Sequence, residues 1–172
     1  MMKNAFLGAG LATALVCAAP AAWAQNAAGQ GFLKKAMEGN LAEVQMGKLA
    51  QEKGASDEVR SFGKQLEQDH AAANDKAAAV AKDMGMTPPT EPNKQQKAMY
   101  DRLAKLSGDK FDRAFARAMV ADHKNDIREF QQEAKKTSEK PAGYAKGELP
   151  TLQKHLQMAQ SLEGKRGTTG SH

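Results

Sequence analysis

The sequence predicts an all-α fold, a four-helix bundle built from two helical hairpins. Alanine, lysine and glutamine are plentiful, aromatic residues make up only 5% of the chain, and β-branched residues are few. This composition favours helix over strand. Apolar residues recur at the helical spacing in four long segments. A proline-rich stretch divides those segments into two pairs, which predicts two hairpins.

The length and charge of the chain narrow the classes of protein to consider. A chain of 172 residues suits one domain. Charged residues make up 26% and apolar residues 41%, as in ordinary globular proteins. The net charge of +5 comes from charges interspersed along the chain, without a basic block. We therefore expect no nucleic-acid partner, whereas a homo-oligomer is compatible with the sequence.

Residues 1–24 have the pattern of a secretory signal peptide. Lys3 supplies the positive start, Ala5–Ala19 is a short apolar run, and Ala22–Ala24 fits a cleavage site of the A-x-A type. The apolar run is too short to span a membrane. We expect cleavage after Ala24, a periplasmic or secreted location, and no transmembrane segment in the mature chain.

Cys17 is the only cysteine, and it would leave with the signal peptide. The mature chain would then have no thiol and no disulfide. A lipid anchor on Cys17 is the alternative, but Val16 stands where a lipobox has a small residue.

The first hairpin is predicted within residues 30–84. Apolar spacing predicts a helix from Gln30 to Lys53, which Gly54 ends as a C-terminal capping glycine. Ser56 is placed to cap a second helix that continues to about Met84.

A crossover separates the two hairpins. Residues 85–92 contain Pro88, Pro89 and Pro92 and predict an extended connector. A short helix follows at Asn93–Leu106. One long crossover between two hairpins is typical of the ferritin-like version of the four-helix bundle.

The second hairpin completes the predicted bundle domain, residues 25–163. Its first helix runs from Asp109, the predicted cap, to about Lys136. Pro141 and Gly143 predict the turn, and the last helix includes residues 149–162 with Pro150 in or near its first turn. Residues 164–172 are polar and predict a disordered tail.

The two hairpins share a repeat that ends in Asp-His. Phe62, Leu66 and Asp69-His70 recur at the same spacing as Phe115, Met119 and Asp122-His123. Each histidine lies fourteen residues after its predicted cap, which indicates two copies of one unit.

Four polar side chains are expected in the apolar interior. At 100° per residue, His70, His123 and His155 each lie near the middle of the apolar stripe of its helix. Glu43 takes the matching place on the first helix, although counting from the turn places it about one helical turn away from His70. We expect the four side chains to approach one another in the middle of the bundle.

The arrangement resembles the family called domain of unknown function 4142. The resemblance covers roughly Gly31–Leu162. It rests on these motifs: Glu43-Val44, Asp69-His70, Phe111-Asp112, Asp122-His123 and Leu149-Pro150-x-Leu152-x-x-His155-Leu156. Members of that family are bacterial, mostly exported and grouped with ferritin-like helical bundles. The resemblance therefore implies the fold and export, and no established activity.

Two kinds of chemistry fit the four polar side chains. Imidazole and carboxylate are the usual ligands of zinc, copper and iron, and bundle cores commonly hold such sites. In the other interpretation Glu43 accepts hydrogen bonds from two histidines, which gives a satisfied polar core without metal. The sequence leaves both interpretations open, with one transition-metal ion as the candidate cofactor.

Neighbouring side chains are candidates for supporting the ligands. Asp69 and Asp122 either orient histidines or pair with lysine or arginine on the next helix, and we favour the pairing. Met119 and Met158 share faces with His123 and His155, and thioether with imidazole is a copper ligand set. Methionine at helical spacing more often fills the core.

Di-iron chemistry is not expected. Glu67 and His70 have the Glu-x-x-His spacing of di-iron bundles, but Val120 and Leu152 stand at the corresponding positions before the other two histidines. The sequence also has no Ser-His-Asp order, phosphate-binding loop or c-type haem motif, so we expect no enzyme.

The leading interpretation is an exported bundle that binds one transition-metal ion or a small ligand between its helices. The alternative is an interaction or stress-protective module whose histidines only specify core packing.

Overall fold

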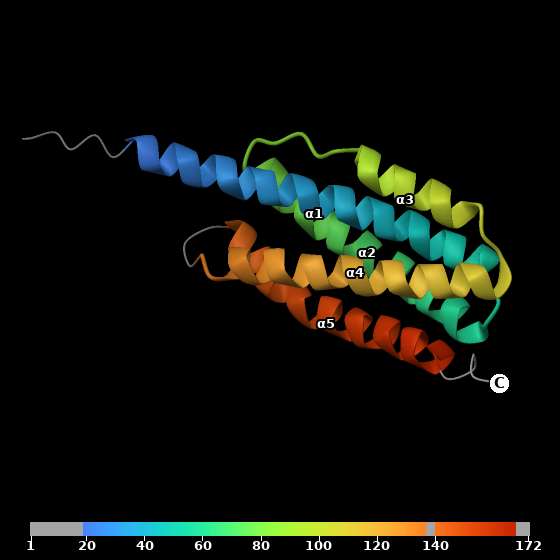
Figure 1. The fold of residues 1–172 in the computed structure, drawn as a ribbon. Helices are drawn as coiled ribbons and strands as arrows, with labels where there is room; N and C mark the ends of the chain where they lie inside the picture. The colour runs from blue at the N-terminus through green and yellow to red at the C-terminus, as the bar shows by residue number, and fades with distance from the viewer. Residues whose placement is uncertain (1–18, 137–139, 168–172) are drawn as a thin grey trace, which may run out of the picture.

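The computed structural model describes residues 19–136 and 140–167, and within them every regular element is a helix (Figure 1). The five helices are α1 (Ala19–Lys53), α2 (Asp57–Asp83), α3 (Lys94–Ala104), α4 (Gly108–Ala134) and α5 (Lys140–Gly167). The all-α prediction is confirmed. Within the described residues, no helix is both long enough and apolar enough to cross a membrane.

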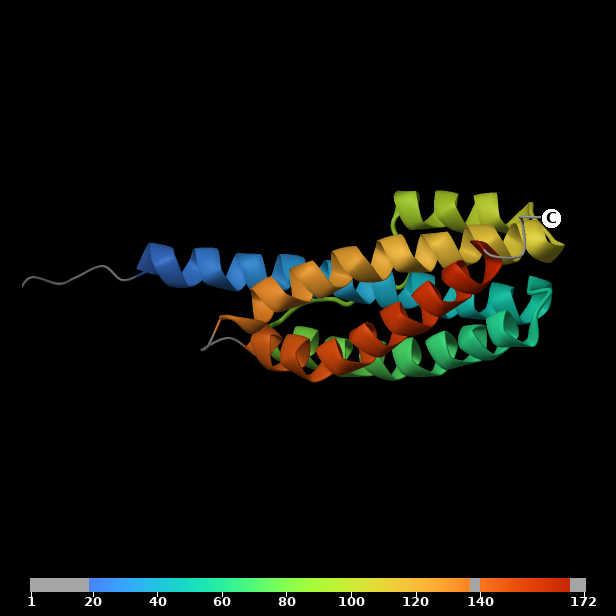
Figure 2. The ribbon, with the colours of Figure 1, turned by 60° about the horizontal axis from the view of Figure 1, so that its bottom comes forward.

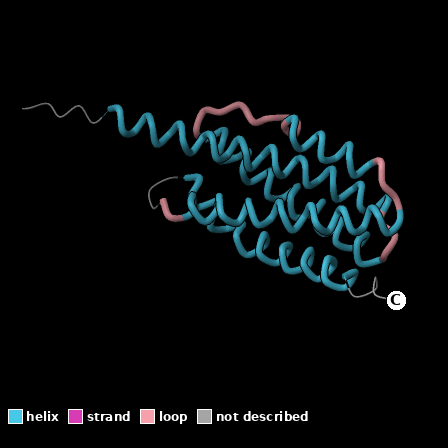
Figure 3. Tube along the Cα trace, in the orientation of Figure 1, coloured by secondary structure: helices cyan, strands magenta, loops and turns pink. Residues whose placement is uncertain are grey.

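The four long helices form a bundle of two hairpins (Figures 1 and 2). α1 packs along α2, and α4 packs along α5. α2 contacts α5 and α1 contacts α4, so the two hairpins close around one interior. The long loop from α2 leads to α3, which lies outside the bundle against α1 and α4 (Figure 3). This is the ferritin-like arrangement that the crossover predicts.

The turn of the first hairpin is fixed by local hydrogen bonds and by α4. The Ser56 hydroxyl accepts a hydrogen bond from the Val59 amide, as predicted for the cap of α2. Asp112 of α4 is fully buried and accepts from the amides of Ala55 and Ser56 at 2.9 and 3.0 Å. The motif Phe111-Asp112 therefore ties the first hairpin to the second.

α5 differs from its prediction. The helix begins at Lys140, so the turn predicted at Pro141 and Gly143 is wrong. Pro141 is tolerated because the amides of the first helical turn have no partner within the helix. Pro150 lies in the interior of α5, where it removes a hydrogen bond, and α5 bends between its orange start and red end (Figure 2).

Three other boundaries differ from the prediction. α1 begins at Ala19, well before Gln30, and α5 continues to Gly167, beyond the predicted end of the domain at residue 163. The N-cap of α4 is Ser107, two residues before Asp109, so the two histidines of the repeat are not equally distant from their caps. Residues 1–18, with Cys17 and most of the predicted signal peptide, and residues 168–172 of the predicted tail lie outside the described residues.

The bundle interior has two apolar clusters with a polar layer between them. One cluster lies near the first hairpin turn and includes Phe62, Leu66 and Phe115. The other lies toward the opposite end and includes Phe32 and Phe130. Between them are the buried polar residues Asn40, Glu43, His70, His123 and His155, each between 0% and 5% exposed.

Candidate metal centre

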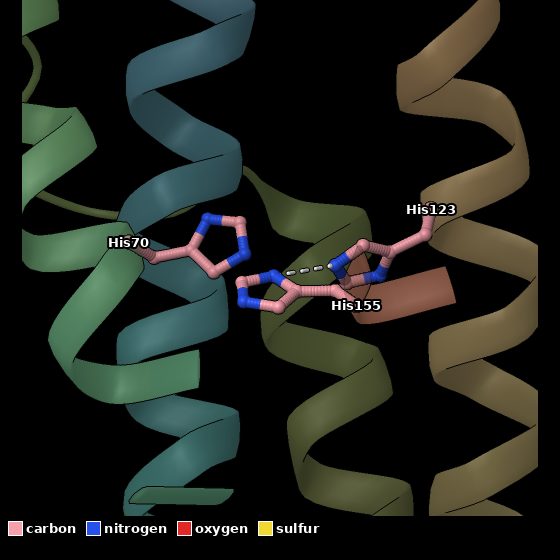
Figure 4. Close-up of side chains that lie close together, drawn as sticks. All are labelled: His70, His123 and His155. Carbon is pink, nitrogen blue, oxygen red and sulfur yellow. Dashed lines mark hydrogen bonds between the residues drawn. The ribbon is translucent and has the colours of Figure 1, made fainter. Parts of the chain in front are cut away.

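Three histidines from three helices converge in the polar layer (Figure 4). The rings of His70 on α2, His123 on α4 and His155 on α5 point toward one another, with centroids 5.3–5.7 Å apart. One ring nitrogen from each histidine lies within 4.8 Å of the other two. This part of the convergence predicted from helical spacing is confirmed.

Each histidine is held from outside by an oxygen atom. His123 Nδ1 lies 3.0 Å from the Met119 carbonyl, and His155 Nε2 lies 2.8 Å from Asp69 Oδ2. His70 Nδ1 lies 2.9 Å from Asn40 Oδ1. These oxygens accept, so each of the three nitrogens carries a proton and donates it outward.

The Asn40 amide is itself fixed by a second hydrogen bond. Its Nδ2 donates to the Tyr144 hydroxyl at 3.0 Å, which leaves Oδ1 to accept from His70. The orientation of the His70 ring therefore depends on α1 and α5 as well as on α2.

The inward nitrogen of each ring is unprotonated, and the lone pairs of these nitrogens face one another. A neutral imidazole has one protonated nitrogen, and in each ring that nitrogen is the outward one. His123 Nε2 then faces His155 Nδ1 at 3.3 Å with no proton between them. His70 Nε2 is buried and has no hydrogen-bond partner. A proton or a metal ion bound between the rings would relieve this arrangement.

Burial keeps these imidazoles neutral. Burial, with smaller contributions from the neighbouring histidines, holds the pKa of His70 well below its usual value. Burial lowers the pKa of His123 to about 4 against the opposing charge of Asp122, and it lowers the pKa of His155 against Asp69. Neutral imidazole is the form that coordinates metal.

Asp69 supports His155. The pairing with lysine or arginine that the sequence favours for Asp69 is not the contact that the structure shows. Its Oδ2 accepts from His155 Nε2 and from Gln65 Nε2. Partial burial acts to raise the pKa of Asp69, but these hydrogen bonds outweigh it and lower that pKa. A carboxylate bound to the far nitrogen of a histidine is the usual support of a metal ligand.

Glu43 is buried but lies beside the three histidines instead of among them. A carboxylate oxygen of Glu43, one of Asp122 and a ring nitrogen of His123 lie within 4.8 Å of one another. His70 and His155 are not part of that cluster. The residue of α1 that reaches His70 is Asn40, about one turn before Glu43. The expected convergence of all four side chains is therefore incomplete, because the one-turn offset is not absorbed.

Burial raises the pKa of Glu43 well above its usual value, and the neighbouring carboxyl groups of Asp122 and Asp126 raise it further. One of its oxygens, Oε2, is buried without a hydrogen-bond partner. Glu43 therefore does not accept the hydrogen bonds from two histidines that a metal-free polar core would need.

The remaining predicted residues have other roles. Glu67 binds Gln51 and Lys48 on α1, away from the histidines. Met119 reaches His123 through its backbone carbonyl, and Met158 packs against the apolar cluster near the first hairpin turn. Asn40 and Tyr144 were not predicted, because neither residue type has a spacing that singles it out from sequence.

The fold and site define an all-helical bundle with a buried three-histidine cluster. The family model of the domain of unknown function (DUF4142) matches residues 15–162, and the chain belongs to that family. The family resemblance found from the sequence is confirmed.

Among solved structures, the chain is similar to a crystal structure of a DUF305 fragment from Deinococcus radiodurans. The TM-score is 0.70 at 13% identity, covering 80% of this chain and 95% of that one. This likeness supports the fold alone. No curated protein matches the chain.

Proposed function

We propose that this protein binds a single transition-metal ion through His70 Nε2, His123 Nε2 and His155 Nδ1. The observation that carries the proposal is the inward lone pairs, which face one another while each opposite nitrogen donates to an oxygen. Two nitrogens bound to one tetrahedral zinc ion lie roughly 3.3–3.4 Å apart. His123 Nε2 and His155 Nδ1 are already 3.3 Å apart.

The metal-free alternative fits these contacts less well. A histidine that only specifies packing would use both of its nitrogens in hydrogen bonds. His70 Nε2 has no partner, and the contact between His123 and His155 lacks a proton when both rings are neutral. Without metal, one buried nitrogen lacks a partner and two lone pairs face each other. A metal ion bound by the three nitrogens would remove both of these unfavourable features.

The close approach of the three rings favours an ion over a small-molecule ligand. A small cavity of about 10 Å³ lies against His70 on the side of Asn40 and Tyr144, and neither His123 nor His155 lines it. The three inward nitrogens lie within 4.8 Å of one another, a spacing that an ion can bridge and an organic molecule cannot. We accordingly propose metal binding without catalysis on an organic molecule, with zinc, copper or iron as the candidate ions.

The protein is also proposed to act outside the cytoplasm. The support is the signal-peptide pattern of residues 1–24. An exported metal-binding bundle would meet its ion in the periplasm or outside the cell.

The test is metal content and zinc titration. Protein purified from its own compartment without an affinity tag should contain about one zinc, copper or iron per chain by elemental analysis. In calorimetric titration, the wild type should bind one Zn²⁺, and His123→Ala should lose that binding while keeping its helix content. His172→Ala is the matched control, because His172 is the one remaining histidine, and it should leave the stoichiometry unchanged.

Thermal melts separate the two interpretations. Metal that binds the folded chain raises the melting temperature by mass action. If the histidines are only structural, His123→Ala lowers stability by about 1–3 kcal/mol and zinc shifts neither melt. A wild type whose melting temperature does not respond to zinc or copper rules out the proposal.

A further inference from the structure

A second group of charged side chains lies on the other side of His123. A partly open cavity of about 430 Å³ lies between α1, α3 and α4. The charged residues of its wall are Glu43, Asp122, Asp126, Glu129, Lys35 and Arg102. Lys35 pairs with Glu129 at 3.5 Å, and Arg102 donates to the Met99 sulfur at 3.6 Å. Among the described side chains, the three other carboxyl groups have no paired cation. Burial, and then repulsion from Asp122, raises the pKa of both Glu43 and Asp126 well above its usual value, so a cation bound here would take the place of protons.

Glu43 is the least expected of these carboxylates. Its side chain is only 2% exposed, and its Oε2 atom is buried at the cavity wall without a hydrogen-bond partner. A buried carboxylate oxygen without a donor is costly unless a cation or proton reaches it. Among the side chains of residues 27–136 and 140–164, no ion pair involves Glu43, Asp122 or Asp126.

The geometry brings oxygens from two helices to one place. A carboxylate oxygen of Glu43 on α1 and one of Asp122 on α4 lie within 4.8 Å of each other and of a His123 nitrogen. Asp126 follows Asp122 by one turn on the same face of α4 and also lines the cavity.

We propose that Glu43, Asp122 and Asp126 form a second cation site, distinct from the three-histidine centre, for a divalent cation that prefers oxygen ligands. The Nδ1 atom of His123 donates to the Met119 carbonyl, and its Nε2 atom faces His155 in the three-histidine centre of the proposed function. The acidic site therefore offers oxygen atoms only, which suit Mg²⁺, Ca²⁺ or Mn²⁺ more than a softer metal. The cavity volume leaves room for the water ligands that such ions keep.

Mn²⁺ is a suitable probe because its free form is quantified by electron paramagnetic resonance. In a titration of the metal-free full-length chain, we expect the wild type to bind one Mn²⁺. Glu43→Gln and Asp126→Asn should each weaken that binding by about tenfold or more, since affinity depends on the charge of the ligands. Glu129→Gln is the matched control, because it changes a carboxylate of the same cavity that is already paired with Lys35.

His70→Ala separates this proposal from the three-histidine centre. It removes a histidine that is not part of the acidic site, so Mn²⁺ binding should persist while Zn²⁺ binding is lost. The second site is ruled out if the wild type binds no Mn²⁺ up to about 1 mM. It is also ruled out if Mn²⁺ binding survives unchanged in both Glu43→Gln and Asp126→Asn. Loss of Mn²⁺ binding in a folded His70→Ala variant would show that the site is not distinct from the three-histidine centre. Circular dichroism of each variant checks its folding, and two carboxylate variants keep the test decisive if one of them fails to fold.

Discussion

Each core histidine uses one ring nitrogen to fix its orientation and presents the other to the centre. The three outward partners differ in kind: a side-chain amide for His70, a backbone carbonyl for His123 and a carboxylate for His155. Only the carboxylate of Asp69 adds a charge that can stabilise a bound cation. His155 should therefore be the most basic of the three ligands toward a metal.

The pH dependence of zinc binding follows from burial of the rings. A proton and Zn²⁺ compete for the same lone pair, so a lower pKa moves the loss of zinc to lower pH. Exposed histidines, with pKa values near 6.5, would lose zinc below about pH 6. Burial lowers the pKa of all three imidazoles, that of His123 to about 4.

We therefore expect one Zn²⁺ per chain to remain bound at about pH 5.5 and to be lost as the pH approaches 4. Equilibrium dialysis followed by elemental analysis measures this directly. Loss of zinc between pH 7 and 6 would instead indicate ligands on the surface.

At the scale of single helices, the close packing of α1 on α2 positions His70. Gly47 and Gly63 let the two backbones approach, since a Cβ on Gly47 would lie 2.5 Å from the Gly63 carbonyl oxygen. The sequence predicts the hairpin from Gly54 and Ser56, but it does not reveal which glycines stand at the contact. The start of α5 is also not evident from the sequence, because Pro141 and Pro150 lie within the helix. Packing against α2 and α4 outweighs the local cost of Pro150.

Two glycines of α1 give a matched test of this packing. Gly47→Ala should destabilise the fold by about 1–3 kcal/mol, because the added methyl group meets backbone that cannot move away. Gly31→Ala should stabilise it by about 0.5–1 kcal/mol, because Gly31 is exposed on the same helix with nothing within 4 Å of the added carbon. Urea unfolding of both variants measures the difference. Equal effects would show that the contact between α1 and α2 is not close.

At the scale of the whole molecule, helical periodicity was sufficient to predict the bundle and the meeting of three histidines. Periodicity assigns faces, and the hairpin turns assign heights to within about one helical turn. That precision brought His123 and His155 to one level, yet it could not decide whether Glu43 or Asn40 reaches His70. Hydrogen-bond partners such as Tyr144 depend on positions finer than a turn, so they emerge only from the structure.

The first helix extends beyond the bundle, which bears on the predicted cleavage after Ala24. The blue start of α1 continues past the ends of the other helices (Figure 1). Among the side chains that the structure describes, the first apolar one in the core is Phe32, followed by Leu33. A chain that begins at Gln25 keeps Phe32, Leu33 and every later core residue of α1. We therefore expect its free energy of unfolding to lie within about 0.5 kcal/mol of that of the full-length chain.

Urea unfolding of the two chains tests that expectation, and mass spectrometry of exported protein should find Gln25 as the first residue. A chain that begins at Lys34 is the contrasting control. It lacks Phe32 and Leu33 and should lose about 3 kcal/mol or more, because both side chains leave cavities in the cluster around Phe130. Exported protein that retains residues 1–24, or that carries a lipid on Cys17, would contradict the predicted cleavage. A large loss of stability in the chain beginning at Gln25 would instead show that the start of α1 belongs to the folded domain.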